Sequence, residues 1–149
     1  MERKCYHIPT LPAGTTVATV DWNVVPAAQI DTYRWLDGGY EPHAEARLAF
    51  LPGYGFALRM SCVERSPRAI YSGYNEPVYT DSCLEFFAAW AEGSPTRDRR
   101  YMNMEMNARG TLLSCLGTDR HARVPVRDIT GGSIPDVRGE ILPDRWFVT

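Results

Sequence analysis

Apolar and polar residues alternate along much of this chain, and each run of alternation is short. Residues 56–64 (FALRMSCVE) place every second side chain on an apolar side, which is the period of a β-strand with one buried face. Eleven prolines and twelve glycines interrupt the chain and leave little room for long helices. The pattern therefore predicts an all-β fold, with further strands within residues 15–22, 43–51, 77–87, 101–110 and 146–148.

Turns, loops and one helix fill the remaining sequence. Residues 52–55 (PGYG) predict a tight turn that joins the strands on either side into a hairpin. Residues 25–35 predict at most one short helix, with Pro26 in its first turn. Two stretches rich in small, polar and charged residues, 66–77 and 91–100, predict loops.

The sequence closes on Trp146, Phe147 and Val148, which start an apolar strand with no turn after it. An exposed apolar strand at a sheet edge is one that native proteins cover or blunt. We therefore expect either a homodimer that pairs through this strand or a larger domain of which this chain is the front part. No linker or repeat divides the chain, so residues 1–149 are predicted to form a single domain.

Composition narrows the classes of partner. The 16 Lys and Arg residues against 18 Asp and Glu residues give a net charge of -2, which argues against a nucleic-acid partner. There is no apolar stretch of membrane-spanning length and no apolar region behind the early charges, so we expect no membrane partner. We expect a cytoplasmic protein, or a secreted one if the chain is a piece of a larger protein. Four widely spaced cysteines, Cys5, Cys62, Cys83 and Cys115, predict reduced thiols.

Carboxylates and amides stand among apolar residues in two consecutive predicted strands. Alternation places Glu85 on the same face as Phe87, and it places Glu105 on the same face as Asn103 and Asn107. Sequential strands commonly pair, and pairing would bring these polar side chains onto one surface. The sequence therefore predicts a hydrogen-bonding patch on a sheet.

Such a patch suits a neutral polyol. Sugar hydroxyls donate to carboxylate and amide oxygens and accept from amide and guanidinium groups, and an aromatic ring covers the apolar face of the sugar. Arg59 is a candidate donor. The aromatic residues near the two strands in sequence are Tyr71, Tyr74, Tyr79 and Trp90.

Structural roles compete with this interpretation. Glu85 could be solvated or paired with Arg59 or Arg68, and the asparagines could bond to nearby turns. Asp81 could shape a bend, since the D-x-D-x-D pattern of a calcium loop is absent. The methionines are typical of a core, and His7, His43 and His121 share no ligand spacing, so no metal site is predicted.

Two segments in this order resemble a known family. PRAIYSGYNEPVYTDSCLEFF (67–87) and YMNMEMNARGTLL (101–113), followed by Arg120 and Arg123, resemble the carbohydrate-binding family 9-like proteins, relatives of modules attached to xylanases. The resemblance runs from about Trp22 to Val148. It implies a β-sandwich of the jelly-roll or immunoglobulin-like, DOMON-like type, with a sugar gripped between two aromatic side chains.

The resemblance also implies roles for particular residues. Glu85 matches the sugar-binding glutamate of the family, and Asn103, Glu105 and Asn107 occupy polar positions on the neighbouring strand, although the xylanase modules carry an arginine near the position of Glu105. Tyr79 would stand in for one clamp tryptophan, and the other would lie beyond this chain. Arg59 and Arg68 complete the candidate set, and the family also implies calcium.

The predicted function is a noncatalytic carbohydrate-binding module for mono- or oligosaccharides of plant cell-wall type, derived from xylan or cellulose, and linked to carbohydrate catabolism. One alternative is a glycoside hydrolase, similar to an endo-1,4-beta-xylanase, that uses Glu85 and Glu105. The other is a structural or interaction domain completed by a second chain.

Overall fold

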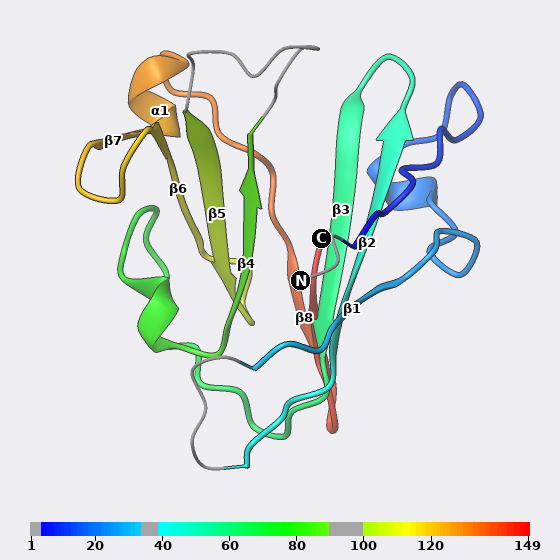
Figure 1. The fold of residues 1–149 in the computed structure, drawn as a ribbon, viewed down its shortest axis with the longest axis horizontal. Helices are drawn as coiled ribbons and strands as arrows, with labels where there is room; N and C mark the ends of the chain where they lie inside the picture. The colour runs from blue at the N-terminus through cyan, green and yellow to red at the C-terminus, as the bar shows by residue number, and fades with distance from the viewer. Residues whose placement is uncertain (1–3, 34–38, 90–99) are drawn as a thin grey trace. The chain divides into compact units, whose positions relative to one another are not determined.

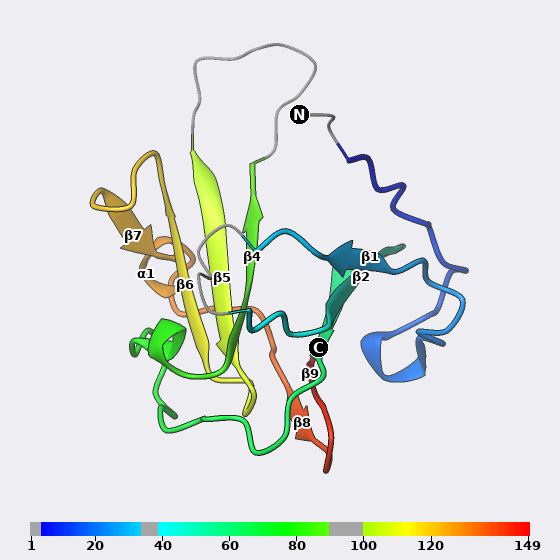
Figure 2. The same ribbon diagram turned by 60° about the horizontal axis from the view of Figure 1, so that its bottom comes forward.

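The regular secondary structure of the described residues is almost entirely β-strand, arranged in two antiparallel sheets. The structure is a computed structural model and describes residues 4–33, 39–89 and 100–149. The first sheet has the order β1 (Ala28–Ile30), β2 (Ala44–Leu51), β3 (Gly55–Cys62), β9 (Trp146–Val148) and β8 (Gly139–Ile141). The second has the order β4 (Cys83–Ala88), β5 (Tyr101–Asn107), β6 (Leu112–Gly117) and β7 (Arg123–Pro125), side by side in Figure 2. The described residues group into two compact units, residues 1–66, 142–147 and 149, and residues 67–141 and 148.

Helices are short wherever the chain is described. They are two turns of 3₁₀-helix, η1 (Val17–Thr19) and η2 (Val78–Thr80), and one α-helix of four residues, α1 (Val126–Ile129). No described helix has the length and apolar character to cross a membrane. This content confirms the predicted all-β fold of the β-sandwich class with at most one short helix.

The predicted hairpin forms as the pattern indicates. β2 and β3 pair antiparallel, with Phe50 opposite Phe56, and the turn between them is visible in Figure 1. Gly53 and Gly55 have φ angles of 88° and 114°, which a residue with a side chain rarely adopts. The PGYG turn therefore depends on its two glycines.

Two predictions near the N-terminus are wrong. Residues 17–19 form η1 rather than a strand, because the side chain and backbone of Thr19 bond to Thr16 and close a turn. The helix predicted over residues 25–35 is absent from the described part of that range, and residues 34–35 lie outside it. Residues 28–30 form β1 instead, because they pair with Ala44–Ala46 of β2.

The prediction of an unpaired C-terminal edge is also wrong. β9 lies between β3 and β8, so it has a neighbour on each side. Trp146 is 1% exposed, and its indole Nε1 donates a 2.8 Å hydrogen bond to Glu64. The strand has a partner within the chain, which removes the reason to expect a dimer through it.

In the second unit, β4 begins at Cys83, later than the alternation predicts, because Asp81 turns into the protein. Its Oδ2 accepts hydrogen bonds from the backbone N–H groups of Ile70 and Tyr71 and from the Asn107 amide, at 2.9–3.1 Å. Burial by itself would raise the pKa of Asp81, but these bonds and the Arg68 charge hold that pKa below its ordinary value. Asp81 therefore fixes the loop that precedes β4.

Replacing Trp146 with alanine tests whether β9 is an internal strand. We expect Trp146→Ala to lower the free energy of unfolding by about 3–5 kcal/mol, because it leaves a large cavity beside the sheet. Urea unfolding followed by circular dichroism measures the loss. Phe56→Ala is the control, since Phe56 is 54% exposed on the same sheet. Equal losses in the two variants would mean that β9 does not pack as described.

Replacing Asp81 with asparagine tests the buried carboxylate. Its folded pKa is depressed, so the ionised group stabilises the protein above the unfolded pKa of about 3.9, and this contribution is lost as the pH falls through the folded value. We expect Asp81→Asn to be less stable than wild type by about 1–3 kcal/mol at neutral pH, and to lose less stability on acidification. Urea unfolding at a series of pH values checks both, with the exposed Asp136→Asn as control. A parallel acid response in wild type and Asp81→Asn would contradict this role.

Candidate functional site

The second sheet gathers the predicted polar residues on one of its faces. β4 and β5 pair so that Glu85 lies directly opposite Glu105, Phe87 opposite Asn103 and Cys83 opposite Asn107. The predicted pairing of these two strands is confirmed. We call this surface the polar face, defined with its neighbours on β6 and β7 as Cys83, Glu85, Phe87, Tyr101, Asn103, Glu105, Asn107, Leu113, Cys115 and Arg123.

The two glutamates of the polar face differ in exposure. Glu105 is 5% exposed, and its Oε1 accepts a 2.8 Å hydrogen bond from the Asn103 amide. Glu85, taken as a whole residue, is exposed to solvent, and it lies on β4, the edge strand of this sheet. Partial burial of its carboxyl group and the nearby charge of Glu105 raise its pKa, while Arg123 partly offsets them. The polar face therefore has an excess of negative charge around Glu85.

Asn103 has one group that the protein does not satisfy. The side chain is 0% exposed, its Nδ2 is used by Glu105, and its Oδ1 has no hydrogen-bond partner. A buried acceptor without a donor is costly, and such groups are rare in folded proteins. Asn103 thus leaves one buried acceptor of the polar face unsatisfied.

Asn107 is placed on the polar face as predicted, but its side chain is occupied. Its Nδ2 donates to the Tyr71 carbonyl and to Asp81, each at 2.9 Å. Its Oδ1 accepts from the backbone N–H groups of Arg109 and Thr111. All these bonds are internal, so the structure gives Asn107 a structural role in place of the predicted ligand contact.

The two predicted arginines are also engaged elsewhere. Arg59 lies on β3 in the first unit, with its guanidinium carbon 4.3 Å from the centre of the Phe147 ring. The Nε of Arg68 lies 3.3 Å from Oδ1 of Asp81, so its ion pair is with Asp81 and not with Glu85. Arg68 is thus held at the Asp81 loop, and the expectation that Arg59 donates to the polar face stays a prediction.

The predicted aromatic residues do not gather on the polar face. Tyr79 is 60% exposed on η2, and among the described residues its ring has no aromatic or cation–π contact with that face. The Tyr74 hydroxyl donates to the Ser114 carbonyl and accepts from the backbone N–H of Arg127. Tyr71 contributes its backbone to the Asp81 loop, and Trp90 lies outside the described residues.

Sequence reasoning missed the aromatic pair that does lie on the polar face. The rings of Phe87 and Tyr101 have centres 5.8 Å apart, and the Arg123 guanidinium carbon lies 5.9 Å from the centre of the Tyr101 ring. Phe87 is 49% exposed, and it is two residues from Glu85 on β4. The alternation that aligned the polar residues places Phe87 and Tyr101 on the same face, so the signal was present.

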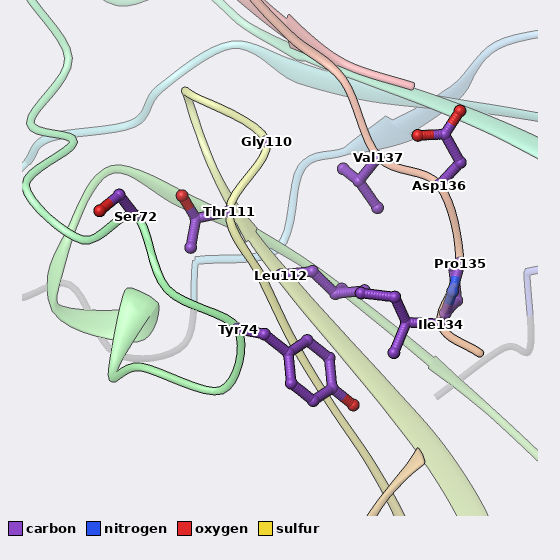
Figure 3. Close-up of a pocket in the computed structure, with 9 residues that line it drawn as sticks. All are labelled: Ser72, Tyr74, Gly110, Thr111, Leu112, Ile134, Pro135, Asp136 and Val137. Atoms are coloured by element: carbon purple, nitrogen blue, oxygen red, sulfur yellow. The ribbon is translucent and has the colours of Figure 1, made fainter. Parts of the chain in front are cut away.

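A separate pocket of about 400 Å³ lies on the opposite side of β6 (Figure 3). Leu112 points into it, and the next residue, Leu113, belongs to the polar face. Gly110 bounds the pocket with a φ of 81°, and a Cβ there would lie 2.5 Å from the Gly139 nitrogen, so this close approach requires glycine. The lining residues are Ser72, Tyr74, Gly110, Thr111, Leu112, Ile134, Pro135, Asp136 and Val137. The location of Tyr74 explains why it is not part of the polar face.

The described residues give no geometric support for a metal centre. Within residues 4–33, 39–89 and 100–149, no three His, Cys, Asp or Glu side chains gather closely enough to hold an ion. All four cysteines are free. Calcium therefore stays a prediction from family resemblance.

Comparisons with known proteins agree with the sequence resemblance. The sequence model of carbohydrate-binding family 9 matches residues 15–132, a range that includes β4, β5, β6 and β7. The crystal structure of a candidate carbohydrate-binding protein from Bacteroides uniformis ATCC 8492 is similar, with a TM-score of 0.69 and 27% sequence identity over 95% of this chain and 68% of that chain. No curated protein matches the sequence. Because the family model covers well over half of its length, this chain belongs to carbohydrate-binding family 9.

Proposed function

We propose that the polar face binds mono- or oligosaccharides of plant cell-wall type, derived from xylan or cellulose, without cleaving them, and that the chain serves carbohydrate catabolism in this way. The observation that carries the proposal is the exposed Phe87 ring beside the Glu85 carboxylate on one strand. A sugar ring needs an apolar surface for its C–H face and acceptors for its hydroxyl groups within the same few ångströms.

The hydrogen-bonding groups on the polar face suit this role. Glu85 accepts from ligand hydroxyls, and Arg123 donates to ligand oxygens at the Tyr101 end of the face. Asn103 and Glu105 lie beneath them, bonded to each other and closed to solvent. We infer that Glu85, Phe87, Tyr101 and Arg123 make the first contacts with the ligand, and that Asn103 and Glu105 support them.

A binding role explains the site better than catalysis. A hydrolase needs a site that excludes water, whereas Glu85 lies exposed on an edge strand. Affinity from one stacked ring and a few hydrogen bonds is modest, at about micromolar to millimolar Kd. This range is sufficient for a module that holds another activity near its polysaccharide.

Removal of the stacking surface tests the proposed function. Titration calorimetry with glucose, xylose, cellobiose and xylooligosaccharides should give heat with at least one sugar, and Phe87→Ala should weaken that binding about tenfold, because the C–H face loses its aromatic partner. Phe56→Ala removes an equally exposed ring from the first sheet and serves as the control. The absence of heat from every sugar at millimolar concentration would refute the proposal, as would an equal effect of both variants.

Glycoside hydrolysis is the second candidate, favoured by the direct opposition of Glu85 and Glu105. Opposed residues on neighbouring strands have Cβ atoms about 4.5–5.5 Å apart, which is compatible with the carboxyl separation of about 5–5.5 Å in retaining enzymes. Hydrolysis of an aryl xyloside by wild type, and its loss in Glu85→Gln, would establish this function in place of simple binding.

A further inference from the structure

The polar face has more acceptors and more negative charge than a neutral sugar needs. Glu85 and Glu105 face each other across β4 and β5, an arrangement in which like charges are destabilising. Among the described residues, neither carboxylate has an ion-pair partner, and Glu105 has one hydrogen-bond donor, the Asn103 amide. The Arg123 guanidinium lies over the Tyr101 ring. A bound cationic group would therefore relieve a repulsion that Arg123 offsets only in part.

A second observation indicates that a donor is missing from the same surface. Asn103 is fully buried, and its Oδ1 has no partner. The Nδ2 of the same amide donates to Glu105, so this unsatisfied oxygen belongs to a residue that is bonded directly to one of the two opposed carboxylates. The unsatisfied oxygen thus adds partial negative charge to a face that already carries two carboxylates.

The surrounding thiols are consistent with this excess of negative charge. Burial and the nearby charges of Glu85 and Glu105 raise the pKa of the Cys83 thiol to about 12. The pKa of Cys115 is also raised, mainly by burial, with Glu105 and Asp128 adding to the effect and Arg123 opposing it. The carboxylates on β4 and β5 therefore raise the pKa of thiols on β4 and β6.

We propose that the polar face selects a sugar that carries a protonated primary amine, such as a hexosamine, over the neutral sugar with the same ring. The ammonium group donates to the exposed Glu85 carboxylate and is attracted by the charge of the buried Glu105 opposite it, while the ring stacks on Phe87. This inference rests on the proposed saccharide-binding role of the same face. It shifts the preferred ligand from neutral wall sugars to amine-bearing ones, and it predicts that uronates are rejected.

The test compares ligands that differ at one group. Calorimetric titration of the whole chain at about pH 6, where a sugar amine is protonated, would use glucosamine, glucose, N-acetylglucosamine and glucuronate. We expect glucosamine to bind about tenfold more tightly than glucose, because hydrogen bonds to a charged group are stronger, and expect added salt to reduce this ratio. N-acetylglucosamine, whose nitrogen carries no charge, should show no such gain, and glucuronate should bind more weakly than glucose.

Two variants locate the effect. Glu85 is exposed, so Glu85→Gln is not expected to disturb the fold. In this variant the ratio of glucosamine to glucose affinity should fall to near one. Glu105→Gln keeps an oxygen for the Asn103 amide and should reduce the same ratio, and its circular dichroism spectrum reports whether it is folded. Phe87→Ala should weaken both sugars and leave the ratio unchanged, because stacking does not sense the amine.

Each other outcome has a distinct meaning. If glucose and glucosamine bind equally to wild type, the inference is wrong and the saccharide-binding function stands. If no sugar binds, the proposed function fails and the inference fails with it. If glucosamine gains nothing but calcium binds and is lost in Glu85→Gln, the carboxylate pair is a metal site and the amine proposal is overturned.

Discussion

The second unit depends on one buried contact, the hydrogen bond between Asp81 and Asn107. Asp81 lies two residues before β4 begins, and Asn107 is the last residue of β5, opposite Cys83. The contact therefore closes the end of the β4–β5 ladder and holds its register. A slip of one residue would turn Glu85 to the other side of the sheet, so the position of the proposed ligand contacts follows from this internal bond.

The same two strands show how far the sequence alone leads. Period-two alternation predicts which side chains share a face, and the pairing of neighbouring strands predicts that Glu85 and Glu105 meet, as they do. Alternation cannot distinguish an amide with an unsatisfied oxygen, as in Asn103, from one whose hydrogen bonds are all internal, as in Asn107. The role of Asn107 depends on the Tyr71 loop and on the turn at Thr111, and the alternation within the strand carries no information about either.

The failures elsewhere have a different origin. β1 is three residues long, too short to carry a period, and it forms because β2 offers it backbone partners. β9 was predicted as a strand, but its own three residues do not encode its position between β3 and β8. Residues 28–30 followed a weak helical pattern that pairing with β2 overrides. Phe87 was missed for the opposite reason: its placement was clear from the pattern, but the predicted aromatic residues were Tyr71, Tyr74, Tyr79 and Trp90.

The four thiols differ in reactivity because of where the fold places them. Burial together with neighbouring carboxylates raises the pKa of Cys83 to about 12 and that of Cys62 to about 11, which keeps both in the unreactive thiol form at neutral pH. Cys5 is exposed near the N-terminus. A maleimide dye would therefore attach first at Cys5, which gives the protein a natural handle for fluorescence or surface immobilisation that leaves the polar face unmodified.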